Sequence, residues 1–320
     1  MGVNTKAIKR RIKSVSSTKK ITKAMEMVAA AKMRKAVDTA LKTRTYAKLA
    51  WDILVDLSKT QKSEIALLKT RRVKKVLLIL ITSNRGLCGS FNSNIIKKTA
   101  IQMNNPKNLS RQRIEGKDLE TEGPVLVDVL GLGKKGAEFS KKMGYNLIAS
   151  FTDISDTPGL KDILPICKMA IDEYANKNYD KVVVAYTDFK SAINQVPKIR
   201  QVLPISEIDL EKMMGDIGEE DLQKEKTKIV ADTKVGDYLF EPGRDEVLEI
   251  ILPRLVESQV LQAALESAAS EHSSRMVAMR SASDAAVEMI DELNLNFNKA
   301  RQAGITQEIA EIAGGAAALE

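Results

Sequence analysis

The first stretch of the chain, from Thr5 to about Leu57, has no glycine or proline and is rich in alanine, lysine, methionine and leucine. Residues of this kind favour helix, and the absence of a breaker predicts one helix over the whole stretch. The polar, basic segment from Lys59 to Lys75 follows it. Apolar positions recur at steps of three or four with one skip, which predicts a narrow buried stripe made of Ile8, Ile12, Val15, Ile21, Met25 and Val28.

The most regular periodicity lies near the other end, where a second long helix is predicted from Arg244 to about Ala303. This helix would be ~90 Å long, whereas a domain of ~130 residues has a radius of gyration near ~14 Å. It cannot lie wholly on such a domain, so its natural partner is the N-terminal helix in an antiparallel coiled coil. The predicted seam comprises Leu261, Leu265, Ala268, His272, Met276, Met279, Ser283, Ala286, Ile290, Leu293, Phe297 and Ala300.

Between these helices, apolar runs of strand length alternate with helical segments, which predicts a Rossmann-like α/β domain with a mostly parallel sheet. Helices are expected at Lys135–Met143 and Leu160–Asn176. The expected strands and extended segments are Val76–Ile81, Val125–Leu130, Tyr145–Phe151, Lys181–Tyr186 and Ile193–Leu203.

The chain thus divides into four expected parts. These are a helix at residues 1–60, an α/β body at 74–205, a charged linker and body-closing segment at 206–243, and a helix at 244–313. Within the body, the polar, breaker-rich stretch Asn104–Gly123 is expected to be an exposed insertion.

One motif suggests a dinucleotide site. The sequence GLGKKG at Gly131–Gly136 follows a predicted strand and precedes a predicted helix, and Asp153 and Asp156 follow roughly 20 residues on, where a ribose-binding acid could lie. Three glycines also serve to turn the chain and to pack a helix closely on a sheet. The motif follows the second predicted strand rather than the first, which favours packing. A nucleotide-binding Rossmann enzyme stays open as an alternative.

The charge of the chain is unevenly distributed. Residues 1–75 carry 21 Lys and Arg against 5 Asp and Glu, whereas the whole chain has a net charge of +8. A basic limb therefore precedes a mildly acidic body, which implies an acidic partner unless the limb is simply solvated. A basic coiled coil that binds nucleic acid is a second alternative, although the limb lacks interleaved aromatic residues.

Reactive groups are sparse in this sequence. Cys88 and Cys167 are too few and too distant for a disulfide framework or a metal knuckle. The only histidine, His272, lies on the predicted seam, where an interhelical hydrogen bond is expected. No nucleophile, phosphate-loop or paired-carboxylate motif stands out. We therefore expect no catalytic residue, cofactor or metal. No apolar run approaches the ~20 residues that cross a bilayer.

Several longer motifs carry a family resemblance. KKITKAMEMVAAAKMRKA at Lys19–Ala36 and the stretch Ser273–Leu319 closely resemble the terminal helices of the gamma chains of rotary ATP synthases of bacterial type. SNRGLCGSFN, QVPKIRQVLP, DYLFEP and VESQVLQAALESAASEHSSRM resemble the intermediate motifs of that family. The resemblance runs nearly from end to end.

The resemblance implies a function. In that family the paired terminal helices form the central shaft inside a ring of three alpha and three beta subunits, and the α/β body contacts the epsilon subunit and the ring of membrane c subunits. Rotation driven by ion flow changes the nucleotide affinities of the beta subunits. The gamma chain itself is not catalytic. The family also has a similar glycine turn without a nucleotide role, so GLGKKG is expected to serve packing.

The resemblance also implies partner-binding residues. Met25 in KAMEMV and Arg275 in SRMVAM match shaft positions beside an acidic loop of beta. Tyr238 and Glu241 in DYLFEP match the region near epsilon and the c ring. The remaining positions match contacts of the upper shaft with beta, namely Arg301, Gln302, Thr306 and Glu308.

Two departures from the family pattern stand out. The stretches Asn104–Gly123 and Glu219–Lys228 are longer than in short bacterial chains, and the closely spaced cysteine pair of the chloroplast type is missing. Thiol regulation is therefore not expected. Because the shaft match begins by Lys6, the basic N-terminus is interpreted as mature helix rather than a transit peptide. The resemblance implies a peripheral protein on the cytoplasmic face of a bacterial inner membrane.

Overall fold

The computed structural model describes residues 5–58, 65–110, 112–114, 117–119, 123–205 and 243–317. It divides into two compact units, one made of Met1–Ala30 with Arg275–Glu320 and the other of Ala31–Ser274. Two long helices, α1 (Thr5–Ser58) and α8 (Arg244–Ala317), contribute to both units. The predicted α/β class with two long terminal helices is confirmed.

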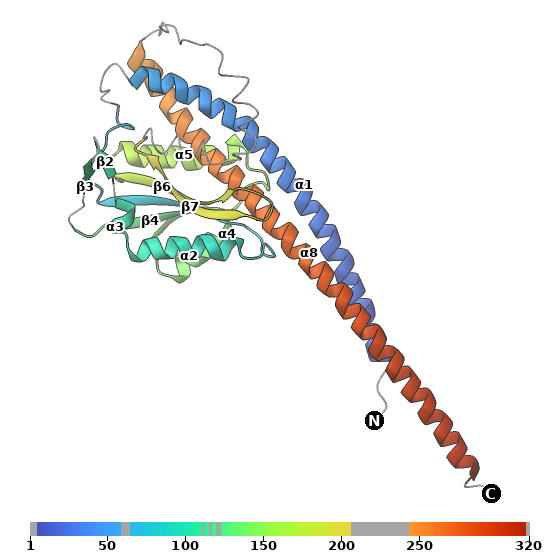
Figure 1. The fold of residues 1–320 in the computed structure, drawn as a ribbon. Helices are drawn as coiled ribbons and strands as arrows, with labels where there is room; N and C mark the ends of the chain where they lie inside the picture. Colours follow the sequence, from blue (N-terminus) through green and yellow to red (C-terminus); the bar gives the residue numbers. More distant parts are fainter. Residues whose placement is uncertain are drawn as a thin grey trace. The chain divides into compact units, whose positions relative to one another are not determined.

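The larger unit is built on a five-stranded sheet with the order β5-β4-β1-β6-β7 (Figure 1). The first four strands in that order run parallel, and only β7 pairs antiparallel, with β6. The central strand β1 sets Ile79 opposite Leu130 of β4 and Val184 of β6. The strands are β1 (Lys75–Ile81), β4 (Leu126–Leu132), β5 (Leu147–Phe151), β6 (Lys181–Phe189) and β7 (Gln195–Leu203).

Each face of the sheet has its own core because successive side chains of a strand point to opposite faces. Leu77, Ile79 and Ile81 of β1 face α5 (Leu160–Ala175) and the first half of α8, from Leu248 to Ala264. The alternate residues of β1 face the other side, which α2 (Phe91–Asn104) and α4 (Lys134–Lys142) cover (Figure 1). The sheet is thus covered on both faces, as its continuous apolar strands predict.

The stretch Asn104–Gly123 was expected to be an exposed insertion, but part of it is buried. Its described residues form α3 (Lys107–Ser110) and the small hairpin of β2 (Gln112–Ile114) and β3 (Lys117–Leu119). Leu109 is buried and joins the core beside Val125. The expectation was wrong at this position because the polar composition of the stretch concealed one apolar anchor.

Each of the twelve positions predicted for the seam of α8 is buried or half-buried. The first of them, Leu261, packs against the core of the sheet and α5. The helix continues to Ala317, beyond the expected end near Ala303. Gly304, Gly314 and Gly315 do not end it, because a glycine costs a helix only about 1 kcal/mol.

The stripe predicted for α1 is partly wrong. Ile21 and Val28 are 60% and 53% exposed, whereas the next residues, Thr22 and Ala29, are buried. Ile8, Ile12, Val15 and Met25 are half-buried, as the stripe predicts. The smaller side chains form the seam because they let the backbone of α8 approach closely, and the bulkier ones are left outside.

Candidate functional site

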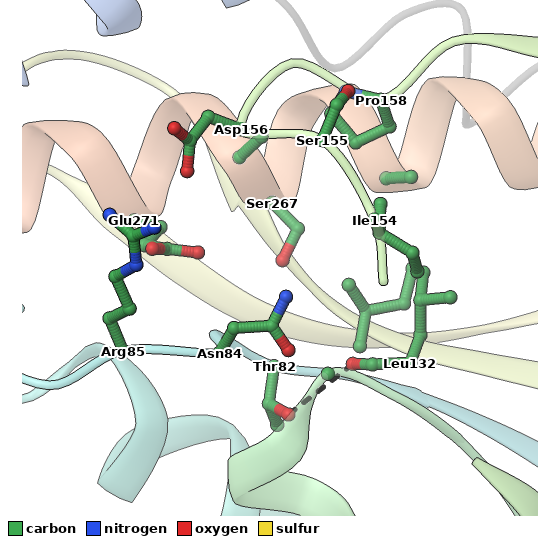
Figure 2. Close-up of a pocket in the computed structure, with 14 residues that line it drawn as sticks. Thr82, Asn84, Arg85, Leu132, Ile154, Ser155, Asp156, Pro158, Ser267 and Glu271 are labelled. Carbon is green, nitrogen blue, oxygen red and sulfur yellow. Dashed lines mark hydrogen bonds between the residues drawn. The ribbon is translucent and has the colours of Figure 1, made fainter. Parts of the chain in front are cut away.

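The carboxyl ends of the parallel strands are where ligands bind in open α/β sheets. In this chain α8 lies across that edge, and Ala264, Ser267 and Glu271 form one wall of a small cavity. Figure 2 shows Ser267 pointing toward Asn84, in the loop after β1. The cavity holds ≈ 50 Å³, which suits a few water molecules but not a dinucleotide, since pockets for such ligands hold about 300 Å³ or more.

Two glycines of GLGKKG, Gly133 and Gly136, allow close packing. Gly133 has φ of +100°, and a Cβ placed on it would lie 2.1 Å from the backbone oxygen of Thr82. A Cβ on Gly136 would lie 2.9 Å from Thr82 Oγ1. Only glycine lets the start of α4 approach β1 so closely.

The backbone donors at the start of α4 are already used within the chain. Lys134 N donates to Asn84 Oδ1 at 3.0 Å, and Lys135 N donates to the backbone oxygen of Ser83 at 3.1 Å. Gly136 N donates to Thr82 Oγ1 at 2.8 Å. A dinucleotide pyrophosphate needs these amides at the helix N-terminus. The geometry therefore argues against the nucleotide-binding alternative.

The described residues contain no group of three or more side chains suited to a metal ion. Both cysteines are buried. Burial raises the pKa of the Cys167 thiol to about 12, and the charge of Glu257 adds to the effect. A thiol with so high a pKa is a poor nucleophile and a poor metal ligand at neutral pH.

His272 contacts a loop of the body. Its Nε2 lies 2.9 Å from the backbone oxygen of Asp156, in the loop between β5 and α5. The side chain of Asp156 in turn accepts a hydrogen bond from Lys32 of α1. Lys32 holds the pKa of Asp156 below its usual value, mainly through this hydrogen bond. One loop of the body thus holds both long helices, and Asp156 is occupied rather than free to bind a ribose.

A second contact fastens α8 to the hairpin of β6 and β7. Ser270 Oγ donates to the oxygen of Thr187 at 3.2 Å, and Ser273 Oγ donates to the oxygen of Ala192 at 2.6 Å. Ser274 Oγ donates to the side-chain oxygen of Gln195 at 3.1 Å. The serines that follow one another along α8 therefore bind the backbone and side chains of the body. Sequence periodicity shows small residues here but not what they contact.

The residues proposed to bind beta fall into two groups. Met25 of α1 and Arg275 of α8 are half-buried in the smaller unit. The bond between Thr22 and Ser283 sets an antiparallel register that brings Arg275 opposite Ala30, which is about 7 Å along the helix axis from Met25. The two side chains are thus near one another along the pair.

The other four positions lie on one segment of α8. Arg301, Gln302, Thr306 and Glu308 are all exposed, and Thr306 Oγ1 donates to the backbone oxygen of Gln302 at 3.0 Å. Every residue whose burial is described beyond Ala300 is exposed, including an apolar row of Ile305, Ile309 and Ile312. Tyr238 and Glu241 lie outside the described residues.

Comparisons with known proteins agree over almost the whole length. A family model described as ATP synthase matches residues 4–319. The ATP synthase gamma chain of Alkaliphilus metalliredigens is 40% identical over 321 residues, covering 100% of both chains, and that of Chloroflexus aurantiacus is 38% identical over 320 residues, covering 99% of each. The central stalk and c ring of the Tetrahymena thermophila mitochondrial ATP synthase contains a similar chain, with a TM-score of 0.54 and 26% identity over 82% of this chain and 99% of that chain.

Proposed function

Because the chain belongs to the family of ATP synthase gamma chains, we propose that its paired terminal helices are the rotor shaft that turns inside a ring of three alpha and three beta subunits. A gamma chain is a non-catalytic subunit of the central stalk. It couples rotation of the membrane c ring to conformational change at the beta subunits, where ATP is made or hydrolysed.

The exposed end of α8 carries this proposal. From Arg301 to Gly315 every side chain is exposed, although Ile305, Ile309 and Ile312 form an apolar row. Isolated helices of ~12–15 residues are marginal in water, and an apolar row on a helix usually faces a partner. A ring of other subunits would shelter this segment along its whole length.

We propose that the beta subunit contacts the shaft at two places along its length. Met25 and Arg275 would lie beside an acidic loop of beta, which would also explain the strongly basic N-terminal limb. Further along the shaft the contacts would be made by Arg301, Gln302, Thr306 and Glu308, and their exposure supports the proposal.

The base of the stalk is also proposed from the family pattern. Tyr238 and Glu241 would contact the epsilon subunit and the c ring. We keep the division into a shaft helix at 1–60, a body at 74–205, a closing segment at 206–243 and a shaft helix at 244–313 as the functional division of the chain.

A gamma chain is a peripheral part of a membrane complex. None of the helices among the described residues is long and apolar enough to cross a bilayer, so contact with the membrane would come through the c ring. We place the protein on the cytoplasmic face of a bacterial inner membrane because gamma chains of bacteria match it over nearly their full length.

Neither alternative function, a nucleotide-binding Rossmann enzyme or a coiled coil that binds nucleic acid, is supported. The sheet edge that would hold a dinucleotide is covered by α8, and the amides of α4 are used within the chain. The basic limb of α1 lies within the stretch that matches the ATP synthase family, and a contact with an acidic loop of beta would account for its charge without nucleic-acid binding.

Copurification tests the proposal. The full chain, tagged and expressed in its own cell, is isolated from solubilised membranes and its companions are identified. We expect alpha, beta and epsilon chains together with ATPase activity. Recovery of the chain without alpha and beta, from cells whose ATP synthase is intact, would rule the function out.

A further inference from the structure

Two acidic side chains lie together in the interior of the larger unit. Asp188 is near the end of β6 and its side chain is 1% exposed, while Glu266 of α8 is 2% exposed. Ser270, one turn along α8 from Glu266, donates to the backbone oxygen of Thr187, which precedes Asp188, so the two acidic residues lie in one region. The charge of Asp188 acts on Glu266 there. Two adjacent buried carboxyl groups cannot both ionise without a large cost, so such a pair tends to retain one proton.

The neighbouring cations indicate which of the two is ionised. Lys198 Nζ lies 2.7 Å from Asp188 Oδ2, and Lys190 Nζ lies 3.6 Å from the same oxygen. Glu266 has a neutral hydrogen-bond partner, since Gln262 Nε2 donates to Glu266 Oε1 at 2.9 Å. Asp188 is therefore the carboxylate of the pair, and Glu266 is the side that holds the proton.

Charged groups on the other elements packed here have smaller effects on Glu266. Arg200 of β7 favours the ionised form of Glu266, but its effect is smaller than those of burial and of Asp188. The long helix α1 packs nearby through Ala36 and Val37, against Ala268, Ala269 and Phe189. Over Thr5–Thr43, where its side chains are described, no ionisable group of α1 is among those that shift the pKa of Glu266.

One carboxylate oxygen of Asp188 has no hydrogen-bond donor in the described part of the chain, and a protonated Glu266 could provide one. Among the described residues no hydrogen-bond donor reaches Asp188 Oδ1, although this atom is buried. A buried acceptor without a donor destabilises the folded state. A protonated Glu266 has an O–H group that satisfies it. Burial, followed by the charge of Asp188, raises the pKa of Glu266 to about 8.

We propose that Glu266 carries a proton at neutral pH and donates it in a hydrogen bond to Asp188, and that this acid pair is a proton-dependent anchor of α8 on the sheet. The serine contacts at Ser270 and Ser273 follow directly along the same helix. Loss of the proton places a second negative charge in the interior and removes the bond between Glu266 and Asp188, while the bond from Ser270 to Thr187 remains.

The anchor makes Glu266 a positioning residue. It contacts no reacting group and acts by fixing α8 to the body. Its importance for torque rests on the proposed function, because only a rotor needs a helix that cannot slip against its base. The anchor itself is a property of the isolated chain and is tested on it.

The direction of the pH dependence follows from the raised pKa. Between the ordinary value of 4.5 and about 8, Glu266 holds a proton in the closed state that it loses when α8 opens. Opening therefore becomes easier as the pH rises through this range. Above pH 8 both states are ionised and the dependence levels off.

Amide hydrogen exchange on the full chain tests this inference. Protection factors of the amides around Glu266 are measured from about pH 6 to about pH 9 and are expected to fall about tenfold per pH unit up to pH ~8, then to level off. Glu266→Gln keeps a donor for Asp188 without a titratable proton, so its protection should stay constant. Glu249→Gln, at an exposed position of the same helix, is the matched control and should behave like the wild type.

A carboxyl-carbon NMR titration gives a second readout that does not depend on one variant folding. In the wild type, one glutamate signal should titrate near pH 8, and Asp188→Asn should move it to lower pH by removing the neighbouring charge. Equal pH dependence of protection in the wild type and Glu266→Gln, or no glutamate that titrates above pH 7, would overturn the inference. Either result would leave the copurification test of the shaft untouched.

Discussion

Thr22 Oγ1 lies 2.7 Å from Ser283 Oγ, and this buried contact joins the two long helices across 261 positions of the sequence. The backbone oxygens of Lys19 and Met279 lie within reach of the same two hydroxyls. One hydroxyl therefore donates to the other, which in turn donates to the backbone of its own helix. The pair fixes the antiparallel register of the smaller unit where the surrounding seam consists of small side chains.

The first prediction concerns this contact. Thr22→Val should lower the free energy of unfolding by about 1 kcal/mol because it leaves Ser283 with one buried bond fewer. The double variant with Ser283→Ala should cost less than the sum of the two single changes, with a coupling of at least about 0.5 kcal/mol. Urea unfolding of the full chain measures both. Thr18→Val, which removes only an exposed local bond, is the control. If the free-energy changes of Thr22→Val and Ser283→Ala were strictly additive, the contact between the two side chains would be contradicted.

The second prediction concerns the glycine turn. Gly133→Ala should destabilise the body by at least about 3 kcal/mol, because the new Cβ would meet the backbone of Thr82 and the residue has a positive φ. Gly144→Ala is the control, since its φ is also positive, at +72°, but no atom lies within 4 Å. It should cost only about 1 kcal/mol. If thermal unfolding showed that Gly133→Ala and Gly144→Ala lower the stability equally, close packing would not be the reason that the motif needs glycine.

The third prediction concerns Asp156 and its partner Lys32. The folded-state pKa of Asp156 is lowered, so its contribution is present above its ordinary value of 3.8 and is lost as the pH falls through the lower folded value. Both side chains are more than one third exposed, so Asp156→Asn should cost at most about 1 kcal/mol at neutral pH and low salt. Unfolding at several pH values should show this difference shrinking as the pH falls below 3.8 and vanishing once the pH is below the folded-state pKa. The difference should also shrink in ~1 M salt. A difference that persists in acid would contradict the ion pair.

The fourth prediction concerns the exposed end of α8. Removing the residues from Gly304 onward should leave the unfolding temperature of the body unchanged, since no side chain described in that segment is buried. The truncated chain should still bind alpha and beta but should transmit less torque, seen as ATP hydrolysis with weakened proton pumping in membrane vesicles. Arg301→Ala and Gln302→Ala should show a milder form of the same loss. Full coupling in the truncated chain would contradict the proposed upper contacts.

The sequence predicted the elements because their signals are local. Continuous apolar runs marked β1 and β6, whereas the polar residues of β7 left it only an expected extended segment. The three- and four-residue steps marked the buried positions of α8. The stripe on α1 was displaced at Ile21 and Val28 because hydrophobicity ranks these residues above Thr22 and Ala29. A seam that selects small size over hydrophobicity cannot be recognised from one helix alone.

The contacts that anchor α8 could not be predicted. Asp188 and Glu266 are 78 positions apart, and nothing local marks either as buried, since most acidic residues are exposed. His272 was recognised as a seam residue, but its partner is a backbone oxygen of a loop, which has no sequence signature. The partner-binding residues came from the family resemblance, because a surface that is complete only in a complex leaves no packing signal in a single chain.

Direct observation of rotation tests the central claim. A fluorescent probe is attached through Lys142→Cys, at an exposed position of α4, and the assembled complex is fixed to a surface through its beta subunits. The native cysteines are buried and should not compete for the label. Addition of ATP should turn the probe continuously in one direction. A probe that stays still while the same complexes hydrolyse ATP would contradict the account.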